Sequence, residues 1–200
     1  MGVKQLAVGI TGASGAIYGV RFVQEVLRAG HTVHLMITEA GWQVFRDELG
    51  WDGGDREQLL AEKLQQQFPG KLRYWTMRDF SSPVASGSAR IDGMIVIPCS
   101  MGTLSGIATG ASGNLLERAA DVALKERRRL VLVPRETPLN AIHLENMLKL
   151  TRMGAVIMPA MPGYYHKPKT LEDLVHFVVG KALDAFDLPH SLFTRWGDGK

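Results

Sequence analysis

Cysteine is almost absent from this chain of 200 residues, because Cys99 is the only one. A single cysteine excludes an internal disulfide and any metal cluster held by several thiolates, and it fits the reducing cytoplasm. We expect Cys99 to be a packing residue, since a nucleophilic thiol needs a lowered pKa and a nearby base. The six histidines also lack the spacing of a metal site. The sequence therefore predicts no bound metal.

Long apolar runs and runs of one charge are also scarce. The most apolar stretch, residues 94–97, stops at Pro98, so no segment reaches the length that spans a bilayer. The N-terminus lacks the features of a signal peptide, and we expect a cytoplasmic protein. A net charge of +3, without basic residues interleaved with aromatic ones, favours an anionic small molecule over nucleic acid.

Short apolar segments alternate with helical patterns along the chain. Strands are expected at residues 5–11, 31–38, 93–98, 130–134 and 155–159, and helices at 16–29, 39–48, 56–67, 114–128, 139–150 and 171–186. Strands that are apolar on both faces are typical of a parallel sheet between helices. The sequence predicts one α/β domain, an open parallel sheet with helices on both faces, as a flavodoxin-like or Rossmann-like three-layer sandwich. Residues 73–89 read as a loop, the fold of residues 49–72 stays open, and residues 187–200 form a C-terminal tail.

Ligands of such sheets bind beyond the carboxyl ends of the strands, so the residues that follow each strand are the candidates. The first is GITGASGAIYG, residues 9–19, whose glycine spacing differs from the G-x-G-x-x-G of nicotinamide sites. It places Ser14 and free N–H groups at a helix N-terminus, which favours an anion, although a merely tight turn is the alternative. Residues 98–105 suit phosphate or flavin contacts, or simply a helix N-cap. Arg135 follows another strand, and its guanidinium suits bidentate phosphate contacts.

Arg118, Asp121 and Lys125 share one face of the helix expected at residues 114–128. A ladder of surface salt bridges is the default explanation of this spacing. The alternative is that Lys125 contributes its charge to an anionic substrate across a subunit boundary. The sequence alone leaves both open.

Taken together, several blocks in order resemble the flavin prenyltransferases of the UbiX type over essentially the whole chain. These blocks are residues 12–16 with 18–19, 86–88, 98–100 with 103–104, 117–128, 135–136 with 138–139, 154–157 and 165–166. The resemblance implies a metal-independent transferase that joins the dimethylallyl group of dimethylallyl phosphate to N5 and C6 of reduced FMN. It also implies a trimer-based dodecamer with sites between subunits. The product, prenylated FMN, would serve a UbiD-type decarboxylase in ubiquinone synthesis or aromatic acid breakdown.

The resemblance also assigns roles to residues. It implies FMN contacts from Gly12, Ala13, Ser14, Thr38, Ser100, Met101, Gly102, Thr103 and Arg135. It implies a prenyl phosphate site of Lys125, Glu136, Tyr165 and Lys181, with Arg118 close by. Ser14 and Glu48 resemble the residues that assist proton movement, and Trp196 resembles an aromatic residue near the site. The position of Lys181 is often arginine in the family, and lysine keeps the charge but loses the bidentate fork.

Two other functions remain open from the sequence. A flavin-dependent cysteine decarboxylase would carry a Pro-x-Met-Asn block, whereas this chain has Pro98-Cys99-Ser100-Met101. A flavin carrier would bind FMN and deliver it to a partner decarboxylase without chemistry.

Overall fold

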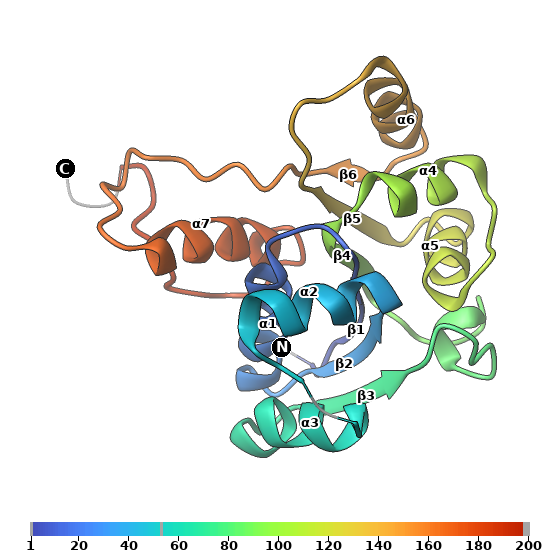
Figure 1. Cartoon of the computed structure of the whole chain (residues 1–200), viewed down its shortest axis with the longest axis horizontal. Helices are drawn as coiled ribbons and strands as arrows, with labels where there is room; N and C mark the ends of the chain where they lie inside the picture. The colour runs from blue at the N-terminus through green and yellow to red at the C-terminus, as the bar shows by residue number, and fades with distance from the viewer. Residues whose placement is uncertain (1, 53, 198–200) are drawn as a thin grey trace.

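The computed structural model describes residues 2–52 and 54–197, which form one sheet of six parallel strands between two layers of helices (Figure 1). The strands are β1 (Gln5–Ile10), β2 (Thr32–Ile37), β3 (Lys71–Trp75), β4 (Gly93–Cys99), β5 (Arg129–Pro134) and β6 (Val156–Ile157). Their order in the sheet is β3-β2-β1-β4-β5-β6. Strands are added in opposite directions on either side of β1 and β4, so the switch point of the doubly wound sheet lies between these two strands. The predicted α/β fold is confirmed.

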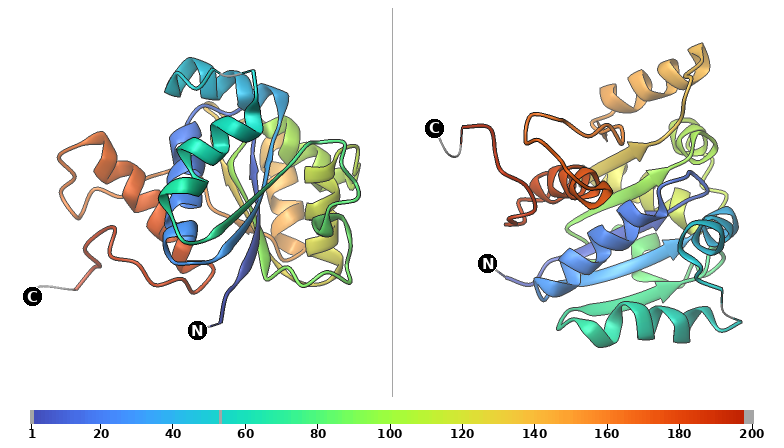
Figure 2. Two further views of the ribbon diagram at one scale, coloured as in Figure 1. Left: turned by 90° about the horizontal axis from the view of Figure 1, so that it is seen from below. Right: turned by 60° about the vertical axis from the view of Figure 1, so that its left-hand side comes forward.

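The helices divide between the two faces of the sheet (Figure 2). They are α1 (Ala16–Arg28), α2 (Glu39–Leu49), α3 (Arg56–Lys63), α4 (Met101–Thr109), α5 (Leu115–Lys125), α6 (Ala141–Arg152) and α7 (Leu171–Asp184). Helix α1 packs against α7 and α2 in one core, and α4 packs against α5 and α6 in the other. The molecule therefore has two apolar cores separated by the sheet.

Strand β1 shows why the strands of this sequence do not alternate between polar and apolar residues. Leu6, Val8 and Ile10 enter the core beside α1, whereas Ala7 enters the core beside α5. Successive side chains point to opposite faces, and both faces are buried, so every position must be apolar.

Two elements differ from the expectation. Strand β3 covers the start of the predicted loop at residues 73–89, and α4 forms where only a loop or an N-cap was expected. Strand β3 is half exposed at the edge of the sheet, so its apolar pattern is weak. Helix α4 is rich in Gly, Ser and Thr, which have low helix propensity, but it buries Leu104 and Ile107 against the sheet. Burial of these side chains in the folded domain, rather than local helix propensity, makes this segment helical.

After β6 the chain leaves the carboxyl edge of the sheet, runs out along the side of the domain and returns as α7, which packs on α1 (Figures 1 and 2). This segment consists of residues 161–170, α7 and the tail at residues 187–197, and we call it the arm. Residues 198–200 of the predicted tail lie outside the described residues. Across residues 2–52 and 54–197, no helix is long and apolar enough to cross a membrane.

Candidate active site at the carboxyl edge of the sheet

Thr11 joins the ends of the two strands at the switch point. Its side chain is buried, and its Oγ1 donates to the Pro98 carbonyl at 2.9 Å while accepting from the Ser100 N–H at 2.7 Å. The turn after β1 and the turn after β4 are therefore held side by side. The sequence analysis did not assign Thr11 a role, because a threonine at a strand end carries no signal of its partners.

The glycine turn at residues 12–15 is pressed against α2. A Cβ on Gly12 would lie 2.4 Å from the Ala40 Cβ, and Gly15 has a φ of +104°, so both positions need glycine. Glu48, from the last turn of α2, accepts hydrogen bonds of 3.0 to 3.1 Å from the N–H groups of Gly15 and Ala16. A carboxylate thus caps α1 and complements its dipole.

This cap corrects the expectation of free N–H groups at the start of α1. The N–H groups of Gly15 and Ala16 already donate to Glu48. A phosphate at this turn would therefore meet the exposed Ser14 side chain instead. On the other side of the turn, Arg135 Nε donates to the Ser14 carbonyl at 3.2 Å. Glu48 and Arg135 together fasten the Ser14 turn from opposite sides.

Thr38 and Ser100 lie at the same edge as helix N-caps, and Met101, Gly102 and Thr103 form the first turn of α4. Thr38 Oγ1 accepts from the Gly41 N–H at 3.0 Å and begins α2. Ser100 Oγ accepts from the Thr103 N–H at 3.4 Å and begins α4, which confirms the predicted N-cap. Two helix N-termini therefore point at this edge and favour an anion there.

Cys99 precedes this second cap but takes no part in it chemically. Its side chain is fully buried, and burial raises the pKa of the thiol to about 12. The thiolate is therefore scarce at neutral pH, and the predicted packing role is confirmed.

A cavity of about 320 Å³ opens beside Arg135. Its lining includes Pro134, Leu139, Met147, Pro159 and Met161, with Glu136 beside Arg135. Glu136 accepts a hydrogen bond from the Thr137 N–H at 3.0 Å. The cavity combines apolar walls with one cation and one carboxylate, as a site for an apolar group attached to an anion requires.

Of the predicted prenyl phosphate residues, Glu136 lies at this edge, whereas Lys125 of the same chain does not. Lys125 ends α5 and lies at the amino edge, where β5 begins. The length of β4, 7 residues, separates the two edges by about 20 Å. Lys125 instead lines a second cavity of about 720 Å³ together with Arg127, Arg128 and Arg152.

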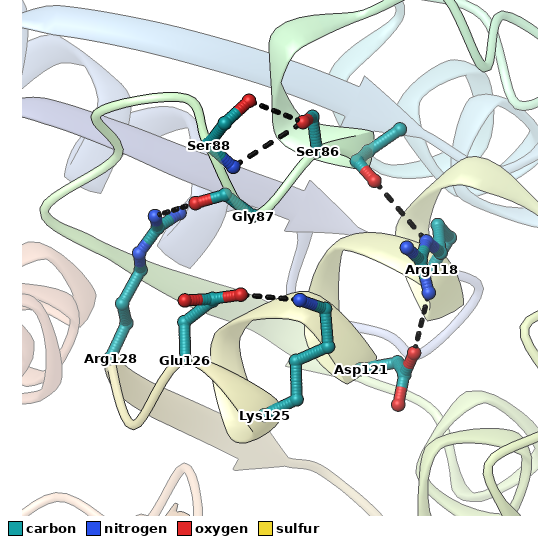
Figure 3. A network of polar contacts seen from close by, with 9 residues as sticks. Ser86, Gly87, Ser88, Arg118, Asp121, Lys125, Glu126 and Arg128 are labelled. Carbon is teal, nitrogen blue, oxygen red and sulfur yellow. Dashed lines mark hydrogen bonds and ion pairs between the residues drawn. The ribbon is translucent and has the colours of Figure 1, made fainter.

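Figure 3 shows how this basic surface is built around the loop at residues 86–88. Arg118 donates to the Ala85 carbonyl at 3.2 Å and pairs with Asp121 at 2.8 Å, so part of the predicted salt-bridge ladder is confirmed. Lys125 pairs with Glu126 rather than with Asp121. Arg128 donates to the Gly87 carbonyl at 2.5 Å. The cations are held by the loop and by neighbouring carboxylates.

The two remaining candidates lie on the arm. The Tyr165 ring meets the Trp196 ring edge to face at 5.4 Å, and Lys181 Nζ lies 3.9 Å from Asp184. Tyr164, the residue before Tyr165, lies near Tyr18 in the first turn of α1. Burial and the neighbouring Tyr164 phenol together raise the pKa of Tyr18. The arm therefore starts close to the carboxyl edge.

Comparison with known proteins decides the family. The sequence matches the Flavoprotein family over residues 1–183. It is 63% identical over 195 residues to the flavin prenyltransferase UbiX of Alkalihalophilus pseudofirmus, which covers 98% of this chain and 97% of that protein. UbiX of Pseudomonas aeruginosa is 46% identical, with coverage of 98% and 96%. The chain belongs to the UbiX family of flavin prenyltransferases.

Solved UbiX structures share the fold. A crystal structure of AnUbiX (PadA1) in complex with FMN and dimethylallyl pyrophosphate has a TM-score of 0.87 and 40% identity, with full coverage of both chains. A dodecameric FMN-dependent UbiX-like decarboxylase from Escherichia coli O157:H7 has a TM-score of 0.84 and 44% identity, covering 96% of this chain and 98% of that one. The cysteine decarboxylase TvaF, at 16% identity and a TM-score of 0.62, shares only the fold.

Proposed function

We propose that this UbiX protein transfers the dimethylallyl group of dimethylallyl phosphate to reduced FMN and releases prenylated FMN. The observation that carries the proposal is the carboxyl edge of the sheet, where two helix N-termini and the Ser14 turn lie and where Arg135, bonded to the Ser14 carbonyl, lines the apolar cavity. When bound there, reduced FMN supplies the nucleophilic N5 and C6 atoms that take the prenyl group as phosphate leaves. Gly12, Ala13, Ser14, Thr38, Ser100, Met101, Gly102, Thr103 and Arg135 would hold it.

The protein would act electrostatically at the leaving group. Breaking an allylic C–O bond leaves negative charge on the phosphate, and fixed cations stabilise that charge without a metal. Lys125, Lys181 and Tyr165 can donate to phosphate oxygens, with Arg118 and Glu136 nearby in the assembled site. Ser14 and Glu48 are the proposed residues for proton movement, and Glu48 already lies against the Ser14 turn.

The site requires more than one copy of the chain. Lys125 and Arg118 belong to α5, and Lys125 lies about one strand length from the flavin edge of its own chain. We infer a homo-oligomer, a trimer-based dodecamer, in which the basic surface of one copy faces the flavin edge of another. The dodecameric UbiX-like relative supports a homo-oligomer of this size.

The product would pass to a separate UbiD-type decarboxylase, and we infer a cytoplasmic location for both. The alternative of a cysteine decarboxylase has only remote structural likeness behind it. The alternative of a carrier would bind FMN but perform no transfer.

One mass measurement tests the proposal. The protein is mixed with anaerobically reduced FMN and dimethylallyl phosphate, and the mass of the released flavin is measured by mass spectrometry. Parallel samples contain dimethylallyl pyrophosphate in place of the monophosphate, or a metal chelator. We expect the flavin to gain one dimethylallyl group with the monophosphate, with or without the chelator. Bound but unmodified FMN in every sample would refute the transfer and favour the carrier.

A further inference from the structure

Asp184, the last residue of α7, holds the C-terminal tail. Arg195 forms two hydrogen bonds to its carboxylate, at 3.0 and 2.6 Å, and His190 lies 3.2 Å from Oδ1. The Leu192 N–H donates to His190 Nδ1, so Nε2 carries the proton of the neutral ring and donates to Asp184. The Arg195 guanidinium keeps the pKa of Asp184 below its usual range. The carboxylate is therefore charged and fully engaged with the tail at neutral pH.

The tail also fits closely against α7 at Gly180. A Cβ at this position would lie 2.5 Å from the Phe193 ring and 2.7 Å from the His190 ring. Glycine is unfavourable in the middle of a helix, so its presence here accompanies this close approach. The His190 side chain is only 3% exposed beneath the tail. The contact with Gly180 is independent of the charge on Asp184.

The tail ends beside the residues proposed for the prenyl phosphate. Phe177, Lys181 and Asp184 follow one another at spacings of four and three along α7, which places them on one face of the helix. The Phe193 ring packs on Phe177 at 5.0 Å, and the Trp196 ring meets Tyr165 at 5.4 Å. The tail therefore packs beside Lys181, whose side chain stays 52% exposed, and brings Trp196 to Tyr165.

We infer that residues 190–196 form a clasp, fastened by Asp184 and seated on Gly180, which positions Tyr165 and Lys181 for the prenyl phosphate. This inference rests on the proposed function. Asp184 acts as a positioning residue: Arg195 and His190 occupy its oxygens at hydrogen-bond distance, while Lys181 stays at 3.9 Å. The ammonium group of Lys181 is thus oriented by Asp184 without being tied to it.

Two variants of the full chain test the clasp by different routes. Asp184→Asn removes the charge that holds Arg195, and Gly180→Ala displaces Phe193 while favouring the helix. Asp187→Asn is the matched control, because Asp187 lies at the start of the tail but pairs with Arg129 at 3.3 Å. The first readout is tryptic cleavage after Arg195, followed as release of residues 196–200, which needs no flavin. The second readout is the KM for dimethylallyl phosphate beside the Kd for FMN.

We expect both variants to be cleaved faster and to raise the KM by about tenfold, the loss of one charge-assisted contact, with unchanged FMN affinity. The control should behave as the native protein. Unchanged cleavage in both variants would overturn the fastening. Faster cleavage with an unchanged KM would overturn the link to the prenyl phosphate. If trypsin cleaves the native protein slowly but the native protein does not prenylate FMN, the proposed function is refuted while the fastening of the tail stays supported.

Discussion

Replacing Thr11 with valine should damage both stability and flavin binding, because one hydroxyl joins the two strands at the switch point. Valine keeps the shape but removes the acceptor of the Ser100 N–H and the donor to the Pro98 carbonyl. The Pro98 carbonyl keeps a weaker bond at 3.3 Å from the Thr11 N–H, so the larger loss falls on Ser100. An unpaired buried donor costs about 1 to 3 kcal/mol.

Thr11→Ser is the matched control, since it keeps the hydroxyl and removes only a methyl group, at a cost of about 0.8 kcal/mol. Urea unfolding at one fixed protein concentration measures stability, because the stability of an oligomer depends on concentration. Fluorescence titration measures FMN affinity. We expect Thr11→Val to lose stability and to bind FMN about tenfold more weakly, since Ser100 caps α4 at the flavin edge. Equal behaviour of the two variants would refute the role of the hydroxyl.

Three further outcomes are expected. Glu48→Gln should retain FMN, because an amide oxygen can still cap α1, yet it should stall product formation in single-turnover assays; unchanged turnover would remove Glu48 from the proposed catalytic residues. Lys125→Ala should raise the KM for dimethylallyl phosphate about tenfold while sparing FMN, and Lys63→Ala on exposed α3 should change neither. His34 is buried, and burial with Arg73 nearby lowers its pKa to about 4. Between the unfolded pKa of about 6.5 and the folded pKa of about 4, His34 is protonated only in the unfolded state. The free energy of unfolding should therefore fall by up to about 2 kcal/mol from pH 7 to 5. His34→Gln should flatten this pH dependence in urea titrations.

The sequence predicted most of the sheet because buried parallel strands have a simple signature. Strands β1, β2, β4 and β5 are apolar on both faces, and their predicted bounds agree with the structure to within one or two residues. Strand β3 and helix α4 were missed, since an exposed edge strand and a helix made of small residues carry weak local patterns. Both are stabilised by neighbours that are distant in the sequence.

The candidate site was predicted as a set of residues rather than as an arrangement. The strand ends indicated Ser14, Ser100 and Arg135, the resemblance added Thr38, and the topology brings all four to one edge. Glu48 came only from the resemblance, and nothing in the sequence indicated that its carboxylate caps α1. Contacts of this kind depend on the distance between two helices that the local sequence does not encode.

The separation of the two proposed phosphate sites follows from the connectivity of a parallel sheet. Each helix that leaves a strand begins at the carboxyl edge and returns the chain toward the amino edge, so α1, α2 and α4 present their positive N-terminal ends to the flavin edge. The same geometry carries the C-terminal end of α5 away from it, and cations such as Lys125 are favourable there because they offset the negative end of the dipole. One chain thus presents helix N-termini at one edge and the cluster of Lys125, Arg127 and Arg128 at the other. A reaction with two phosphate groups can use both only where the amino edge of one copy meets the carboxyl edge of another, which is the physical reason for the oligomer we propose.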